Sequence, residues 1–130
     1  HRTKTFNRYF NYIYVRMGAH TFIHKRTSDD IWKNLFELPL VETDRNLSEE
    51  EFLSSVSFRS LIAEGEVPEV RLVFRNVKHV LSHRVIYANF YEVVLPENSR
   101  SFSEYQCIRM EDLEQYPVSR LVHAFLEKYL

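Results

Sequence analysis

The sequence predicts an α/β (α+β) domain in which a mixed β-sheet is sandwiched by helices. Three observations lead to this fold class. Two long segments rich in β-branched and aromatic residues, 69–80 and 84–95, meet at a short turn. The second segment carries large apolar residues on both of its faces, which is typical of a central strand covered on both sides. A capped helix begins at Ser48, and residues 119–130 place apolar side chains at helical spacing.

The first elements are two strands that form a hairpin. Residues 9–17 are aromatic and β-branched, and residues 20–25 pair back after the turn signal Gly18-Ala19. A polar loop follows. Residues 32–38 then form a short mixed stretch that Pro39 closes.

A helix is expected next because Ser48 and Glu51 form a capping box. Phe52, Leu53 and Val56 are the side chains expected on its buried stripe. The remaining elements follow from turn residues and periodicity. They are a turn at 65–68, strands at 69–80 and 84–95 joined by Leu81-Ser82-His83, a strand at 104–109, a helical turn at 110–115 and a closing helix at 119–130.

The length of 130 residues suits one compact domain, which we assign to residues 8–130 after the end of an interdomain linker at 1–7. Because the chain starts with His1, we expect it to be a piece of a longer protein. No apolar run is long enough to span a membrane. The single cysteine, Cys107, excludes an internal disulfide and a thiolate metal cage, and a reducing cytosol is the natural compartment.

The charge is unevenly distributed although the net charge is only −1. Residues 1–28 carry six Lys or Arg and no acid, and residues 70–91 carry four together with two histidines and no acid. Residues 29–69 carry eleven acids against three bases. If the two basic segments fold together, they form a face that attracts phosphate. The alternative is two ordinary strands whose outward positions are basic.

Three segments resemble one protein family. They are Asn-Arg-Tyr-Phe-Asn-Tyr at 7–12, Lys-Arg at 25–26 with Asp-Ile-Trp-Lys-Asn-Leu-Phe-Glu-Leu-Pro at 30–39, and Lys-His-Val-Leu-Ser-His at 78–83. In this order they resemble the C-terminal, Nudix-like domain of MutY-type A/G-specific adenine DNA glycosylases. The chain departs mildly from that pattern: Asn34 stands where glycine is usual, Phe36 replaces tryptophan, and Leu81 stands where phenylalanine is common.

The resemblance implies a function in base excision repair. Enzymes of this family are hydrolases, specifically glycosidases, that remove adenine mispaired with 8-oxoguanine. Their catalytic residues and 4Fe-4S cluster lie in a separate N-terminal domain, while the C-terminal domain recognises 8-oxoguanine on the opposite strand. The resemblance therefore implies no catalytic residue, metal or cofactor in this chain. It implies as partners double-stranded DNA with an 8-oxoguanine:adenine mispair and the N-terminal catalytic domain, with no membrane, in a cytoplasmic, nucleoid-associated location.

Ser82 and His83 have chemistry that suits this lesion. In 8-oxoguanine, N7 becomes a hydrogen-bond donor and the new oxygen on C8 is an acceptor. A hydroxyl such as that of Ser82 can both donate and accept. His83 can donate to a phosphate or a base edge. Each good contact of this kind contributes about 1–3 kcal/mol to discrimination.

The neighbours of these two residues have supporting roles in this hypothesis. Leu81 can press on a sugar or base, and Lys78 and Arg84 can bind phosphates. His79 is expected to order the turn rather than touch DNA. The alternative is an ordinary hairpin turn, because Ser and His are common there. Zinc binding by His79 and His83 lacks a third ligand.

Two other functions compete with lesion recognition. An active Nudix pyrophosphohydrolase needs several carboxylates on one helix face to hold magnesium. Here Glu49, Glu50 and Glu51 are consecutive and fan about 100° apart, so they cannot converge on one ion. The second rival is a protein-interaction module that uses the acidic segment 29–69, for which a solvated face is the simpler interpretation. Trp32 is expected to anchor the core rather than to stack on a base.

Overall fold

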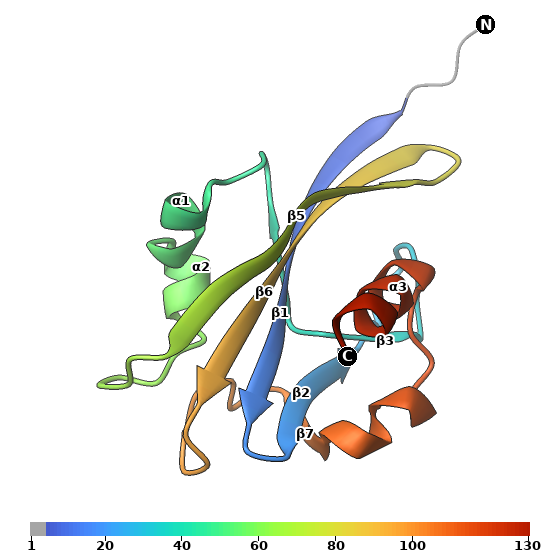
Figure 1. Cartoon of the computed structure of the whole chain (residues 1–130). Coiled ribbons are helices and arrows are strands. Elements are labelled where there is room, and N and C mark those ends of the chain that lie inside the picture. Colours follow the sequence, from blue (N-terminus) through green and yellow to red (C-terminus); the bar gives the residue numbers. More distant parts are fainter. Residues whose placement is uncertain (1–4) are drawn as a thin grey trace, which may run out of the picture.

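The computed structural model, which describes residues 5–130, is built around one mixed β-sheet. The strands follow the order β3-β2-β1-β6-β5, with β4 paired to β1 and β7 paired to β2. Figure 1 shows α1 and α2 on one side of the sheet and α3 on the other, so the predicted fold class is confirmed. The elements are β1 (Phe6–Met17), β2 (His20–Lys25), β3 (Phe36–Glu37), β4 (Leu40–Thr43), α1 (Glu49–Leu53), α2 (Val56–Arg59), β5 (Glu69–Val80), β6 (Arg84–Leu95), β7 (Gln106–Arg109), the 3-10 helix η1 (Met110–Gln115) and α3 (Arg120–Tyr129).

The boundaries differ from the predicted ones at the start of the chain. β1 begins at Phe6 rather than at Tyr9, so it extends into the stretch 1–7 that was expected to end a linker. Residues 1–4 of that stretch lie outside the described residues. β4, which was not predicted, pairs antiparallel with the first half of β1.

The centre of the sheet is the parallel pair of β1 and β6, which runs in register from Phe6 opposite Arg84 to Met17 opposite Leu95. As expected for a central strand, β6 is covered on both faces. One face of β6 packs beneath α3, where the ring of Phe90 stacks on Phe125 with centroids 4.4 Å apart. The other face packs beneath α1 and α2, where Tyr91 stacks on Phe52 at 4.5 Å. Each such pair contributes about 0.5–1.5 kcal/mol beyond the area that it buries.

The predicted helix at residue 48 is two short helices rather than one. The capping box of Ser48 and Glu51 forms as expected and opens α1. Ser55 then acts as a second N-cap, accepting from the N–H of Phe58, and it starts α2 on a new axis. The prediction that Val56 lies on the buried stripe is therefore wrong: its side chain is 86% exposed, and Phe58 is buried in its place.

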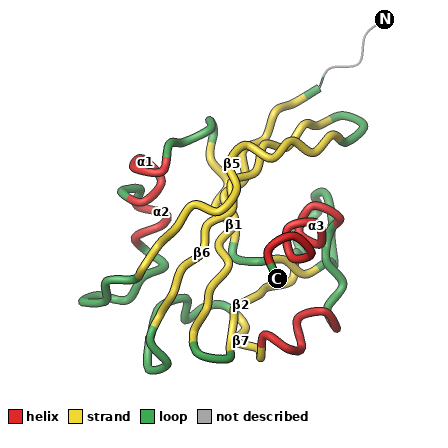
Figure 2. Tube along the Cα trace, viewed as in Figure 1, coloured by secondary structure: helices red, strands yellow, loops and turns green. Residues whose placement is uncertain are grey.

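The β5–β6 hairpin is kinked by irregularities in β5 between Leu72 and Val77. Asn76 has a left-handed backbone, with φ of 60°, and its N–H donates to the side chain of the buried Asn89 at 2.8 Å. Asn89 in turn donates to Asn11 at 3.2 Å. Because bulges increase local twist, these bonded amides set the direction of the outer half of the hairpin. Figure 2 shows that half, together with the start of β1, extending away from α1 and α2, toward the side on which α3 lies.

Candidate nucleic-acid interface

The tip of the β5–β6 hairpin presents two exposed polar side chains. Leu81 donates its N–H to the carbonyl of Arg84 at 2.8 Å and closes the turn. The carbonyl of His83 accepts from the N–H of Phe6 at 3.0 Å, so β1 is bonded to the turn as a third strand. Ser82 and His83 are both exposed, and within residues 5–130 neither side chain makes a hydrogen bond. Their polar groups are therefore open to an external partner.

The two basic residues that flank the turn, Lys78 and Arg84, lie on opposite faces of the hairpin. Lys78 pairs with Tyr87 in the ladder, whereas Arg84 lies on the alternate face, which His79 shares. Lys78 is exposed and Arg84 is half-buried. No ion pair involves either residue in the described part of the chain. The structure therefore places both basic side chains beside the tip but does not bring them together on one face.

Leu81 does not project into solvent. Its side chain is half-buried and packs against the core cluster on the α3 side of the sheet. In this position the Leu81 side chain packs under the turn. A contact between Leu81 and a DNA base requires this side chain to rotate out of its packed position.

His79 packs against Trp32, and this contact joins the hairpin to the loop before β3. The two rings meet edge to face with centroids 5.8 Å apart, and Trp32 meets Phe10 in the same way at 6.3 Å. Burial, followed by the positive charge of Arg120, lowers the pKa of His79. His79 therefore favours the neutral form, and its position suits the predicted role of ordering the turn. The half-buried Trp32 lies between two protein rings, as expected of an anchor.

The loop that holds Trp32 is fixed by ion pairs. Arg8 binds both carboxylate oxygens of Asp30 at 2.9 and 2.8 Å and also binds Glu42 at 2.8 Å. Arg26 binds Asp30 at 3.0 Å and the buried Glu37 at 3.1 Å. The hydrogen bond from Arg8 lowers the pKa of Asp30 to about 2, and the bond to Glu42 is the largest cause that raises the pKa of Arg8. Two of the three segments that carry the family resemblance, 7–12 and 25–26 with 30–39, meet in this network.

These pairs change the distribution of charge expected from the sequence. Several bases counted toward a phosphate-attracting face have protein partners: Arg8 and Arg26 bind acids of the loop, and Arg71 binds Glu92 at 3.3 Å. Among residues 5–130, the positive charge near the tip comes instead from Lys78, Arg84 and one residue that the sequence did not indicate. That residue is Arg120, the exposed first residue of α3, whose charge reaches His79. No local sequence pattern links Arg120 to the hairpin, because only the folded sheet brings α3 beside it.

Asn34 has a left-handed backbone, with φ of 73°. Its N–H donates to the carbonyl of Arg26 at 2.7 Å and closes the loop. Glycine is usual at this place in the related family, and asparagine is among the side chains that tolerate this region best. The departure noted in the sequence therefore preserves the backbone shape of the loop.

One carboxylate of α1, that of Glu51, takes part in capping the helix. Glu51 accepts from the backbone N–H of Ser48 at 2.9 Å and binds Arg45 at 2.7 Å, so its oxygens are occupied by protein donors. Over the described residues, no group of three or more His, Cys, Asp and Glu side chains is placed to hold a metal ion. In that same part of the chain, no helix is both long enough and apolar enough to cross a membrane.

A mixed sheet between helices, with its longest hairpin projecting a polar turn, defines an α+β domain. The NUDIX domain family model matches residues 11–128. The chain belongs to the NUDIX domain family. A comparison with curated protein sequences finds no significant match.

Solved structures share the fold at low sequence identity. The C-terminal domain of mouse MUTYH, solved in complex with human PCNA, superposes with a TM-score of 0.69 at 17% identity, covering 94% of this chain and 86% of that chain. The Nudix hydrolase RenU from M. smegmatis superposes with a TM-score of 0.61 at 11% identity, covering 98% of this chain and 84% of that chain. A MutT structure described for Aliivibrio salmonicida and Vibrio cholerae superposes with a TM-score of 0.58 at 14% identity, covering 94% of this chain and 95% of that chain. The resemblance to a MutY-type C-terminal Nudix-like domain is thus confirmed at the level of the fold.

Proposed function

We propose that this chain is the lesion-recognition domain of a MutY-type adenine DNA glycosylase, which reads 8-oxoguanine opposite adenine so that the parent enzyme removes the adenine. One observation carries the proposal. The hairpin tip exposes the Ser82 hydroxyl and the His83 ring, and neither has a side-chain partner within residues 5–130. The fold shared with the mouse MUTYH domain supports it.

The hydrogen-bonding groups at the tip complement the lesion. The Ser82 hydroxyl can accept from N7–H of 8-oxoguanine or donate to O8. The backbone N–H groups of Ser82 and His83 have no acceptor among the described residues, so they can supply a second donor. Normal guanine has an acceptor at N7 and no O8. A tip that presents both an acceptor and a donor therefore favours the oxidised base.

The basic side chains around the tip are suited to contacts with DNA phosphates. Lys78 and Arg84 lie on the two faces of the hairpin, and Arg120 lies near His79. Such contacts fix the register of the protein on the duplex without reading sequence. We assign this positioning role to the three side chains, and we assign to His79 the ordering of the turn through Trp32.

The catalytic residues and the 4Fe-4S cluster of the parent enzyme belong, in this proposal, to a separate N-terminal domain. Cys107 is the single cysteine of the chain, and a cluster of this type needs four thiolates. The partners proposed for this chain are accordingly that domain and duplex DNA containing the mispair.

The test uses the parent enzyme with Ser82→Ala or His83→Ala, on duplexes that carry adenine opposite 8-oxoguanine or opposite guanine. Single-turnover excision and duplex binding are measured. Loss of one contact of about 1–3 kcal/mol weakens the 8-oxoguanine complex roughly 5- to 150-fold, with a smaller loss on the guanine duplex. Ser103→Ala, an exposed serine in a turn away from the hairpin, is the matched control. Equal losses on both duplexes contradict the proposal.

Two observations favour other functions. The mouse neighbour was solved with PCNA bound, so a protein-interaction module is the second candidate. In that case the Ser82 and His83 variants change neither excision nor binding on either duplex. Membership of the NUDIX family makes a pyrophosphohydrolase the third candidate. We expect no magnesium-dependent hydrolysis of nucleoside diphosphate derivatives, and turnover in such an assay rejects that expectation.

A further inference from the structure

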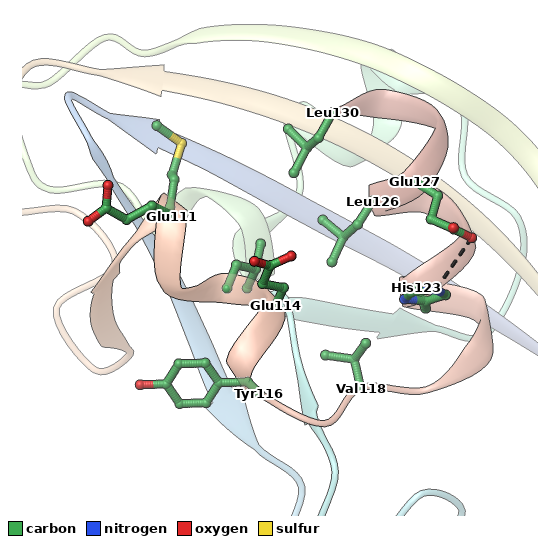
Figure 3. A pocket seen from close by; sticks show the side chains of 10 residues that line it. Glu111, Glu114, Tyr116, Val118, His123, Leu126, Glu127 and Leu130 are labelled. Atoms are coloured by element: carbon green, nitrogen blue, oxygen red, sulfur yellow. Dashed lines mark ion pairs between the residues drawn. The ribbon is translucent and has the colours of Figure 1, made fainter.

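A groove lies between η1 and the C-terminal half of α3, away from the hairpin (Figure 3). Its volume is about 440 Å³, within the range of about 300–1,000 Å³ typical of ligand sites. Leu113, Val118 and Leu126 are among the apolar residues that line it, and Met110 and Leu130 extend the apolar surface. The groove is thus large enough for apolar side chains of a ligand.

The groove exists because α3 uses only one face to cover the sheet. Leu121, Val122 and Phe125 are buried there. Leu126 and Leu130, one turn apart on a neighbouring flank, turn toward η1 instead. Leu130 is 66% exposed and is one of the most exposed large apolar side chains of the described residues. Exposed apolar surface of this kind, edged by polar groups, marks interaction sites.

The edge of the groove is acidic. Glu111 and Glu114 on η1 and Glu127 on α3 line it, and the lining includes no lysine or arginine. Glu111 is bound by Arg109 at 3.0 Å, and Glu127 lies 3.3 Å from His123, as the dashed line in Figure 3 marks. Glu114 has no ion-pair partner in the part of the chain that the structure describes. Carboxylates in these positions repel phosphates and attract cations.

We propose that this groove binds a short amphipathic segment of another protein, with large aliphatic or aromatic side chains flanked by Lys or Arg. The apolar floor accepts the anchoring side chains, and Glu114 and Glu127 pair with the flanking cations. An amphipathic helix in an apolar groove is a common mode of peptide recognition. The inference does not depend on the DNA-reading proposal, because the acidic edge disfavours nucleic acid and the site shares no residue with the hairpin.

The test titrates the isotope-labelled protein with a short synthetic peptide whose leucines lie at helical spacing and are flanked by lysines. The comparison peptide has glutamates in place of the lysines. We expect a Kd below about 1 mM for the lysine peptide, with the largest NMR shifts at the methyl groups of Met110, Val118 and Leu126. The glutamate peptide binds about tenfold more weakly, because the two surface carboxylates of Glu114 and Glu127 each contribute modestly.

A charge exchange provides the decisive comparison. Glu114→Lys combined with Glu127→Lys alters two exposed side chains and reverses the preference, so that the glutamate peptide binds more tightly. Glu104→Lys, an exposed residue outside the groove, leaves the preference unchanged. The proposal is overturned if neither peptide binds the unmodified protein with a Kd below about 1 mM, or if both peptides bind it equally well. It is also overturned if the methyl groups that shift lie outside the groove.

Discussion

At the scale of single residues, Asn34 shows how one backbone angle restricts the side chain. Its φ of 73° is costly for most residues because Cβ crowds the following carbonyl oxygen. Glycine escapes this crowding, and asparagine tolerates it better than alanine does. The loop that carries Trp32 therefore depends on one residue type at its closing position.

Replacing Asn34 separates backbone conformation from side-chain contacts. We expect Asn34→Ala to lower the free energy of unfolding by about 1 kcal/mol, because alanine pays the left-handed penalty. Asn34→Gly changes it by only a few tenths of a kcal/mol. Urea unfolding of the two variants measures the difference. A similar loss in both variants shows that the amide side chain, rather than φ, is what matters.

Asp30 gives a pH-dependent contribution to stability. Its pKa of about 2 in the folded protein, set mainly by Arg8, lies below the value of about 3.9 in an unfolded chain. The carboxylate therefore stabilises the fold fully above about pH 4, and this contribution declines as the pH falls toward 2. Asp30→Asn is expected to lose about 1 kcal/mol at pH 7, because the pair is partly exposed, and much less near pH 2. Urea unfolding at both pH values tests this, and a loss independent of pH contradicts it.

At the scale of elements, α1 and α2 illustrate how a second cap redirects a chain. After Ser55 restarts the helix, Phe58 faces the core and Val56 faces solvent. We expect Phe58→Ala to destabilise the protein by about 3–5 kcal/mol, as for other buried phenylalanines. Val56→Lys changes stability by no more than about 0.5 kcal/mol. Thermal unfolding of both variants checks the contrast, and a large loss for Val56→Lys restores the single-helix prediction.

The elements that the sequence predicted well have strong local signals. β6 was predicted to the residue because its two apolar faces and the turn before it are visible in the sequence. β4 was missed because four residues after Pro39 carry little periodicity, and their strand conformation depends on pairing with β1. The break between α1 and α2 was missed because Ser55 looks like an ordinary helix residue until its hydroxyl binds Phe58.

At the scale of the whole molecule, the position of the tip could be predicted from sequence but its electrostatic surroundings could not. The turn at 81–83 is a local feature. The partners of Arg8, by contrast, are Asp30 and Glu42, which approach only after the sheet forms. Arg120 reaches the hairpin for the same reason. Counting charges along the chain therefore overstated the basic surface near β1 and omitted the contribution of α3.

The parallel pairing of β1 with β6 predicts slow folding. The first strand must find a strand from the second half of the chain before the centre of the sheet exists. Folds dominated by such distant contacts form in about milliseconds to seconds. Stopped-flow refolding followed by the fluorescence of Trp32, the single tryptophan, measures the rate, with circular dichroism as an independent probe. Folding within microseconds contradicts the prediction.

The bond between the N–H of Phe6 and the carbonyl of His83 has a consequence for how tightly the turn can bind. A ribbon of two strands twists and bends readily, whereas a third strand stiffens it. Ser82 is therefore held in place before any ligand arrives. Less conformational entropy is lost on binding, so a contact of ordinary strength yields more affinity than it does on a mobile loop.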